Sequence, residues 1–240
     1  MLARSLIDSA RAPSPRWTSW VGVCLLTSAA LALGGCKANS GGGGETRDDE
    51  VVGNRRSKVE SRTVGAFNVV RVSRGLRVEL KQGPHAVMVR GEENLVPLVQ
   101  TTVEGGALIV TSSESLKPIL PLFVTVTAPS VDVIAGSSAA KIVHTFAQDT
   151  LRIDCSSGAQ CDGAGETKQL RISASSGAKV QAGSALTQSA EITASSGASV
   201  SVRALVRVTG SASSGAKVDV VGSPKERGLT VSSGAKVNWK

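Results

Sequence analysis

The chain contains very few aromatic residues. Among its 240 residues there are three Phe, three Trp and no Tyr, although apolar residues make up 41 % of the sequence. The core must therefore consist of Val, Ile, Leu and Ala, whose small or β-branched side chains fill thin layers between strands. The net charge of +8 is not gathered into a basic cluster with interleaved aromatics. This pattern argues against nucleic acid as a partner.

Residue types that build active sites are also scarce. The two histidines, His85 and His144, are isolated, and we expect both to be solvated loop residues. Enzymes that cleave polysaccharides need carboxylates gathered at one site for calcium binding or acid/base catalysis. The aspartates of the second half of the chain are instead scattered and form no recurring pair: Asp132, Asp149, Asp154, Asp162 and Asp219. The sequence therefore predicts a protein without catalytic residues, cofactor or metal.

The start of the chain has the features of an export signal. Residues 21–34 form an apolar run of about 14 residues, too short to span a bilayer, behind a segment with three arginines. The run ends in Leu33-Gly34-Gly35-Cys36, which resembles the lipobox of bacterial lipoproteins, where the cysteine is acylated before cleavage. We therefore expect residues 1–35 to be a lipoprotein signal peptide. An ordinary signal peptide with a chance cysteine is the alternative.

Lipidation of Cys36 would attach the protein to membrane lipid permanently, because each buried methylene contributes about 0.8 kcal/mol. Lys37 follows Cys36, in place of the Asp that marks inner-membrane retention in enterobacterial lipoproteins. The expected location is the bacterial cell envelope, at the outer membrane. Residues 36–58 are Gly-rich and charged, with little to bury, and are predicted to be a flexible tether.

Residues 136–240 repeat the motif Ser-Ser-Gly-Ala. Its glycines follow one another after 19, 20, 18 and 19 residues: Gly158, Gly177, Gly197, Gly215 and Gly234. One step earlier, residues 136–140 (GSSAA) are a degenerate copy with Ala139 in place of the glycine. A period near 19 residues fits one circuit of a parallel β-helix. The motif is expected to form a corner, with glycine at positive φ and serine hydroxyls satisfying backbone groups.

Between corners, apolar and polar residues alternate, as in residues 151–155 and 170–174, which predicts half-buried strands. Stacking of the coils would align like residues in inner columns. The first column would contain Ile153, Ile172 and Ile192. The second would contain Val180, Val200, Val218 and Val237.

Residues 59–135 lack the repeat but keep the strand pattern, and turn signals separate the strands. Strands are expected over residues 67–72, 76–80, 86–90, 96–103, 107–111 and 122–128. They would form longer, irregular first coils that cover one open end of the solenoid. Phe67 and Phe123 are expected in this core, and Trp239 is expected to plug the last coil.

The order of these segments resembles a known bacterial family. Residues 67–70 (FNVV), 105–110 (GGALIV) and 124–129 (VTVTAP), followed by serial Ser-Ser-Gly-Ala corners, are similar to the putative auto-transporter adhesin, head GIN domain family. The resemblance covers roughly residues 60–238. It implies an all-β fold, a single-stranded right-handed parallel β-helix with coils of about 19 residues, on exported and often lipid-anchored proteins. It brings no catalytic residues.

Cys155 and Cys161 flank one corner, at positions where other coils have Ala and Val. Both side chains should point inward across the turn. In an oxidising envelope they are expected to form a disulfide. Buried free thiols are the alternative, whereas a metal site is disfavoured because no His or third Cys is near in sequence.

The expected function is that of a non-enzymatic envelope lipoprotein with an adhesion or surface-interaction domain. Besides membrane lipid through Cys36, its expected partner is an unidentified envelope protein or polysaccharide. One alternative is an envelope scaffold that assembles by weak self-association of the solenoids. The other is a carbohydrate-active β-helix enzyme.

Overall fold

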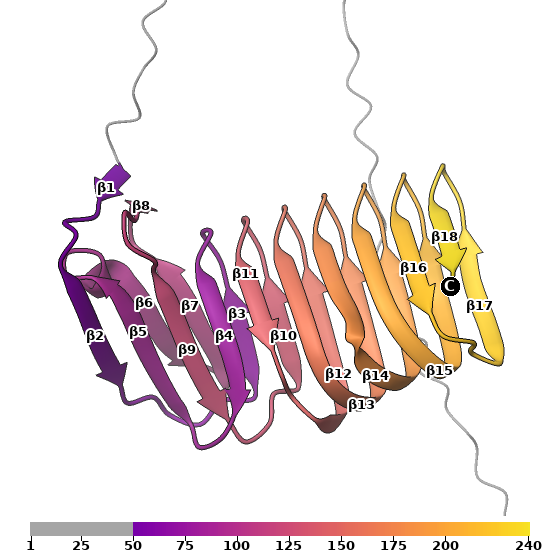
Figure 1. The fold of residues 1–240 in the computed structure, drawn as a ribbon, viewed down its shortest axis with the longest axis horizontal. Coiled ribbons are helices and arrows are strands. Elements are labelled where there is room, and N and C mark those ends of the chain that lie inside the picture. The colour runs from indigo at the N-terminus through magenta and orange to yellow at the C-terminus, as the bar shows by residue number, and fades with distance from the viewer. Residues whose placement is uncertain (1–49) are drawn as a thin grey trace, which may run out of the picture. The chain divides into compact units, whose positions relative to one another are not determined.

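The computed structural model describes residues 50–240, whose regular coils form a solenoid of parallel strands (Figure 1). Each coil runs along one face, bends, and returns along the other face. The coil strands are β10 (Val133–Gly136), β11 (Lys141–His144), β12 (Gln148–Cys155), β13 (Gln160–Ala174), β14 (Lys179–Ala194), β15 (Ser199–Ala212), β16 (Lys217–Val221), β17 (Glu226–Val231) and β18 (Lys236–Trp239). The predicted β-solenoid with coils of about 19 residues is confirmed.

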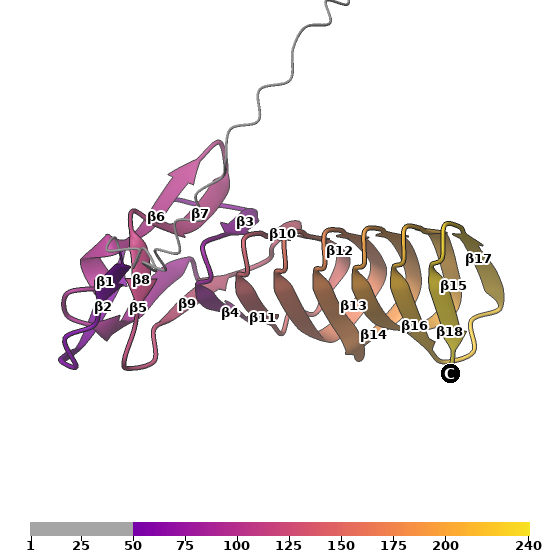
Figure 2. The same ribbon diagram turned by 90° about the horizontal axis from the view of Figure 1, so that it is seen from above.

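Two stacks of strands make the two faces, and β13, β14 and β15 pass through the bend from one to the other. Face A consists of β3 (Val69–Val72), β10, β12, the second halves of β13, β14 and β15, and β17. Face B consists of β4 (Arg77–Gln82), β11, the first halves of β13, β14 and β15, β16 and β18. Figure 2 shows them on opposite sides of the solenoid.

The core consists of apolar columns that run along the solenoid between the faces. Ile153, Ile172 and Ile192 pair in register on face A, and the column continues back to Ile134. On face B the valines pair from Val180 through Val200 and Val218 to Val237. Both predicted columns are confirmed. Each fully buried Ile or Val contributes about 1.5–3 kcal/mol through removal of apolar surface from water.

The Ser-Ser-Gly-Ala corners are tight turns with two residues in the left-handed region. In one corner Ser157 has a φ of 50° and Gly158 a φ of 71°, and the Ala159 N–H donates to the Ser156 carbonyl, 3.0 Å away. Two successive positive φ values define the turn that Asn-Gly or Ser-Gly pairs favour. The Gly158 N–H donates to the Ser176 carbonyl of the next corner at 3.0 Å, so the corners also form a hydrogen-bonded stack.

The expected role of the serine hydroxyls is wrong. In the described part of the chain, no hydrogen bond joins a hydroxyl of a Ser-Ser-Gly-Ala corner to another protein group. Backbone groups of the neighbouring corners satisfy one another instead, because in-register stacking brings each corner N–H under a carbonyl. The second serine of each corner is exposed to solvent.

Differences in coil length are absorbed at the bend opposite the serine corners. Strands β13 and β14 shift register between Asp162 and Ala164, and β14 and β15 shift between Ala182 and Thr187. The serine corners themselves stay in register across all coils. One end of the coil is therefore fixed and the other is adjustable.

Residues 83–129 form a cap at one end of the solenoid, and their strands are β5 (Ala86–Glu92), β6 (Val99–Glu104), β7 (Ala107–Ser112), β8 (Ser115–Lys117) and β9 (Phe123–Ala128), with the 3-10 helix η1 (Val96–Leu98). β7 and β9 stack in parallel on β3 and β4, although they follow them in the chain. β5 and β6 pair antiparallel with β9 and β7. The six expected strands are present, but antiparallel strands, β5 and β6, are added to the parallel pair β7 and β9.

A buried carboxylate holds the outer part of the cap together. Glu92 is fully buried and accepts hydrogen bonds from the backbone N–H groups of Arg55 (2.7 Å) and Ile119 (2.9 Å). Burial raises the pKa of Glu92, but these backbone donors outweigh it and hold the pKa below its ordinary value. A Cβ at Gly53 would lie within 2.2 Å of this carboxylate, so only glycine fits there.

The structured part begins earlier than the sequence indicated. β1 (Glu50–Val52) pairs with β8, and β2 (Ser57–Arg62) pairs with β5. Residues 50–58 are therefore strand and loop, not tether, because the cap offers open strand edges to them. The rest of the expected tether lies outside the described residues. Within residues 50–240, no helix is long and apolar enough to cross a bilayer.

Candidate functional site

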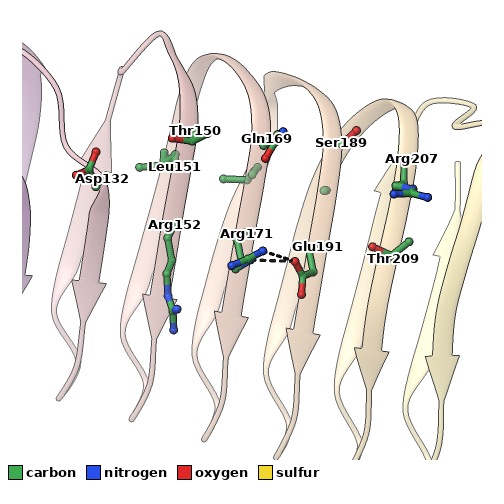
Figure 3. A pocket seen from close by; sticks show the side chains of 12 residues that line it. Asp132, Thr150, Leu151, Arg152, Gln169, Arg171, Ser189, Glu191, Arg207 and Thr209 are labelled. Carbon is green, nitrogen blue, oxygen red and sulfur yellow. Dashed lines mark hydrogen bonds and ion pairs between the residues drawn. The ribbon is translucent and has the colours of Figure 1, made fainter. Parts of the chain in front are cut away.

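An open groove of about 430 Å³ runs across four strands of face A (Figure 3). Its floor contains Leu151, Leu170 and Ala190, which are nearly fully buried. Two outward rows flank the floor and cross the coils in register. The first row holds Thr150, Gln169, Ser189 and Arg207, and the second holds Arg152, Arg171, Glu191 and Thr209.

The arginines of the groove pair with carboxylates across or along the strands. Arg171 reaches Glu191 in the next coil, with its Nη2 2.8 Å and its Nε 2.9 Å from Oε2 (Figure 3). Arg152 Nε lies 2.9 Å from both carboxylate oxygens of Asp154, two residues further along the strand. These side chains are about half exposed, so each pair contributes only about 0–1 kcal/mol to stability. The pairs fix side-chain positions more than they stabilise the fold.

The carboxylates of the groove are not placed for glycoside hydrolysis. Asp132 directly precedes Val133, and Val133 lies three coils away from Glu191 in register, through Arg152 and Arg171. Three coils at about 4.8 Å each separate the two acids by about 14 Å. A hydrolytic pair stands about 5–10 Å apart. The groove can therefore form hydrogen bonds and ion pairs with a ligand but does not present an acid and base to one bond.

His144 lies in the core, which corrects the expectation of a solvated loop residue. It is 3 % exposed, follows Ile142 with strand alternation, and pairs in register with Leu80. Neither ring nitrogen has a hydrogen-bond partner, and burial lowers the pKa of His144 to about 4. Phe146 is buried two residues further on, with its ring centroid 6.4 Å from that of His144.

His85 is half-buried in the cap, with its ring centroid 4.7 Å from that of Phe67, so it is not a freely solvated residue either. Phe67 lies in the core as expected, whereas Phe123 is only half-buried beneath Arg77, 5.3 Å from its ring centroid. Trp239 is half-buried in the last coil against Arg227. Within residues 50–240, no three His, Cys, Asp or Glu side chains gather as metal ligands.

Cys155 and Cys161 lie on either side of one corner and both point into the core. They pair in register with Ala174 and Val180, as the repeat indicated. Both are buried free thiols in the structure. A hydrogen bond with the Cys155 thiol, together with burial, raises the pKa of Cys161 well above its ordinary value. Their pairing as a disulfide stays a prediction.

The other predicted positions lie away from the groove. The corner glycines Gly158, Gly177, Gly197, Gly215 and Gly234 form an exposed edge of the solenoid, with φ values of 71–74°. Cys36 lies outside the described residues. Sequence reasoning missed the groove, although its signal is present: the central residue of each Leu-Arg-Ile or Ala-Glu-Ile triplet points outward, at Arg152, Arg171 and Glu191.

The fold and the groove define an all-β solenoid that presents repeated polar side chains on an open surface. A family model described as "Putative auto-transporter adhesin, head GIN domain" matches residues 66–224, and the chain belongs to this family. The resemblance predicted from the sequence is thereby confirmed. Membership points to the cell surface or the envelope. A search of curated proteins finds no match.

Several solved structures share the fold. A putative adhesin from Bacteroides fragilis is 15 % identical and superposes with a TM-score of 0.60, over 79 % of this chain and 100 % of its own. A putative adhesin from Parabacteroides merdae is 13 % identical and superposes with a TM-score of 0.52, over 80 % of this chain and 99 % of its own. A putative lipid binding protein from Parabacteroides distasonis is 13 % identical and superposes with a TM-score of 0.51, over 80 % of this chain and 100 % of its own. None of these names describes an enzyme.

Proposed function

We propose that the protein is a non-enzymatic adhesion module of the bacterial envelope. The observation that carries this proposal is the face A groove, whose polar rows repeat from coil to coil along the solenoid. Small-molecule sites bury most of their ligand in a concave, largely apolar pocket. An open groove with repeated polar rows suits an extended partner, such as a polymer or a strand of another protein. Family membership supports this function.

The proposal includes a lipid anchor at Cys36 and a location at the outer membrane. It rests on Leu33-Gly34-Gly35-Cys36 after an apolar run, and on Lys37 directly behind the cysteine. Metabolic labelling with palmitate tests it in cells that produce the full chain or its Cys36→Ala variant. The full chain should label and the variant should not. Equal labelling of both proteins contradicts the anchor.

Adhesion is tested with whole cells that produce the full chain, an Arg171→Ala/Arg207→Ala variant, or no such protein. Retention on a surface coated with envelope fragments of the same bacterium is counted after washing. The full chain should increase retention, and the variant should lose most of the increase because two rows of the groove lose their fixed polar groups. Retention equal to that of cells without the protein contradicts the proposed function.

A further inference from the structure

Face B carries a row of basic side chains that the adhesion groove on face A does not include. The position directly after each corner alanine, and after Leu76 in β4, pairs in register from coil to coil, starting in β4 and ending in β18. Two of the seven positions are Gln160 and Ser199. The other five, all exposed, form the basic row: Arg77, Lys141, Lys179, Lys217 and Lys236. Figure 2 shows the strands that carry it along one side of the solenoid.

The basic row is not neutralised in the way that the arginines of face A are. Among residues 50–240, Lys141, Lys179 and Lys236 make no ion pair, and only Lys217 contacts a carboxylate, that of Asp219 at 3.3 Å. Like charges on neighbouring strands repel each other and destabilise a sheet. Lys217 and Lys236 nevertheless stand directly opposite each other. The three lysines without an ion pair therefore leave a positive potential along the row.

The row is a line rather than a patch. Six coil steps of about 4.8 Å give it a length of about 29 Å, at right angles to the strands. The next outward row, two residues further along each strand, contains the acidic residues Glu79, Asp162 and Asp219. A planar anionic membrane would press on both rows, whereas a single polymer chain can follow the basic row alone. The charge pattern therefore fits a one-dimensional polyanion.

A second line of polar groups accompanies the basic row. The exposed second serine of each Ser-Ser-Gly-Ala corner lies three residues before the basic-row position of the same strand, as Ser176 precedes Lys179. These hydroxyls make no hydrogen bond to protein in the described part of the chain. They repeat at the same spacing as the lysines. A ligand with both anionic groups and hydroxyls would match the two lines.

The basic row begins at a hollow of about 410 Å³ beside the cap. Three basic side chains, Arg74, Arg77 and Lys141, line it together with the apolar surfaces of Pro118, Ile119 and Pro121. Ile119 is 46 % exposed there. An apolar surface edged by cations accommodates the C–H face of a sugar ring while its acidic group pairs with a basic side chain. The hollow therefore offers a place for one end of the polymer.

We infer that the basic row binds a linear acidic polysaccharide, one that carries carboxylate groups on its sugars. Lysine ammonium groups act as point charges that suit single carboxylates, whereas bidentate recognition favours arginine. Single-stranded nucleic acid requires stacking platforms, and no aromatic residue occurs in the row. The inference rests on the proposed adhesion function and names the class of ligand that a second face of the module would hold.

Polygalacturonate, a linear polymer of an acidic sugar, is the probe, and dextran is the uncharged control. Binding is measured by titration calorimetry with the full chain in detergent at low and high salt. Replacement of Lys141, Lys179 and Lys236 by Gln should weaken binding roughly tenfold to a hundredfold. The matched control Arg56→Gln/Lys168→Gln/Lys225→Gln removes three exposed positive charges that lie outside the basic row and should keep the affinity within about threefold. Equal losses in both triple variants would mean attraction by net charge alone and overturn the inference.

A gain of affinity provides an independent test, because it does not depend on a weakened variant that folds poorly. Ser199→Lys fills a gap in the basic row and should tighten binding of polygalacturonate several-fold. The protein should discriminate little between vesicles of phosphatidylglycerol and of phosphatidylcholine, and should not prefer duplex DNA to polygalacturonate. A preference for phosphatidylglycerol that the Lys→Gln triple variant abolishes would assign the row to a lipid surface. Stronger binding of DNA than of polygalacturonate would assign it to nucleic acid, and either result would overturn the inference.

The cell retention assay separates failure of this inference from failure of the proposed function. If cells with the full chain are retained but polygalacturonate does not bind, the ligand class is wrong and adhesion stands. If polygalacturonate binds through the row but cells are not retained, the basic row is a binding site and the adhesion proposal fails.

Discussion

The backbone N–H of Ala139 donates to the carbonyl oxygen of Ser157 over 3.0 Å, and to do so Ala139 adopts a φ of 60°. In the next corner Gly158 takes the same place, with a φ of 71° and a bond of 3.0 Å to Ser176. An alanine in the left-handed region costs about 1–2 kcal/mol because its Cβ approaches the backbone. This corner thus has two side-chain-bearing residues in the left-handed region, Ser138 and Ala139, where the corner of Ser157 and Gly158 has one, and its neighbours hold it in shape.

Ala139→Gly should therefore stabilise the protein. Relief of the strain exceeds the loss from a more flexible unfolded chain, for a net gain of about 0.5–1 kcal/mol. The matched control is Gly177→Ala, where an added Cβ meets nothing within 4 Å and the backbone conformation alone should cost about 1 kcal/mol. Urea denaturation measures both. Equal stability of the wild type and both variants would show that a Cβ at this corner position causes no backbone strain.

His144→Leu should make the protein more stable and less sensitive to mild acid. The pKa of His144 is about 4 in the fold and about 6.5 when unfolded, so between these values the unfolded state binds the extra proton. Wild-type stability should therefore fall as the pH drops from 6.5 to 4, by about 2 kcal/mol at pH 5 from this residue. Leucine matches Leu80, its partner in register, and removes this loss. Denaturation curves at pH 7 and 5 measure it, and an unchanged pH dependence contradicts it.

Glu92→Gln should lower the melting temperature at neutral pH. In the folded protein the pKa of Glu92 lies below its ordinary value, so the ionised carboxylate stabilises the fold at pH values above the ordinary carboxyl pKa. This stabilisation is lost as the pH falls through the pKa of Glu92 in the folded protein. The two proteins should therefore converge in acid. Glu93→Gln is the control, since Glu93 pairs only with the exposed Arg56. Melting curves from pH 3 to 7 test this, and a gap that stays constant with pH would show that the charge is irrelevant.

Protein isolated from an oxidising envelope should contain the Cys155–Cys161 disulfide. The loop of seven residues should contribute about 2 kcal/mol, which reductant removes. The stability of Cys161→Val, which restores the valine of the neighbouring coil, should not respond to reductant. Alkylation of the unfolded protein, followed by peptide mass spectrometry, shows which cysteines are free thiols. Modification of both cysteines without reductant contradicts the disulfide.

Much of the solenoid could be predicted because its determinants repeat within a single coil. The spacing of the corner glycines gave the coil length, and alternation around Ile153 and Ile172 gave the inward positions. The same alternation, applied to residues 141–146, would have placed His144 and Phe146 with Ile142 in the core. His144 was expected in a solvated loop because its polar neighbours obscured the pattern.

The cap and the groove depend on pairings that a local pattern does not contain. Ser73-Arg74-Gly75-Leu76 forms another corner, with φ values of 56° and 68° at its centre, and the Gly75 N–H bonds to Ser138 at 2.8 Å. It was missed because Arg74 replaces the second serine and residues 83–129 separate it from the array. Likewise, the pairing of Arg171 with Glu191 follows from the register of two coils and not from their spacing alone.

The bend opposite the serine corners, between Ala182 and Thr187, takes up extra residues while the corners keep their register. A loop, an epitope or a small domain spliced into that bend would leave the stacked turns undisturbed. Diversification of this protein would then proceed along one edge only, with new specificities carried on a backbone that does not change. The same edge is where an engineer would graft foreign sequences for display.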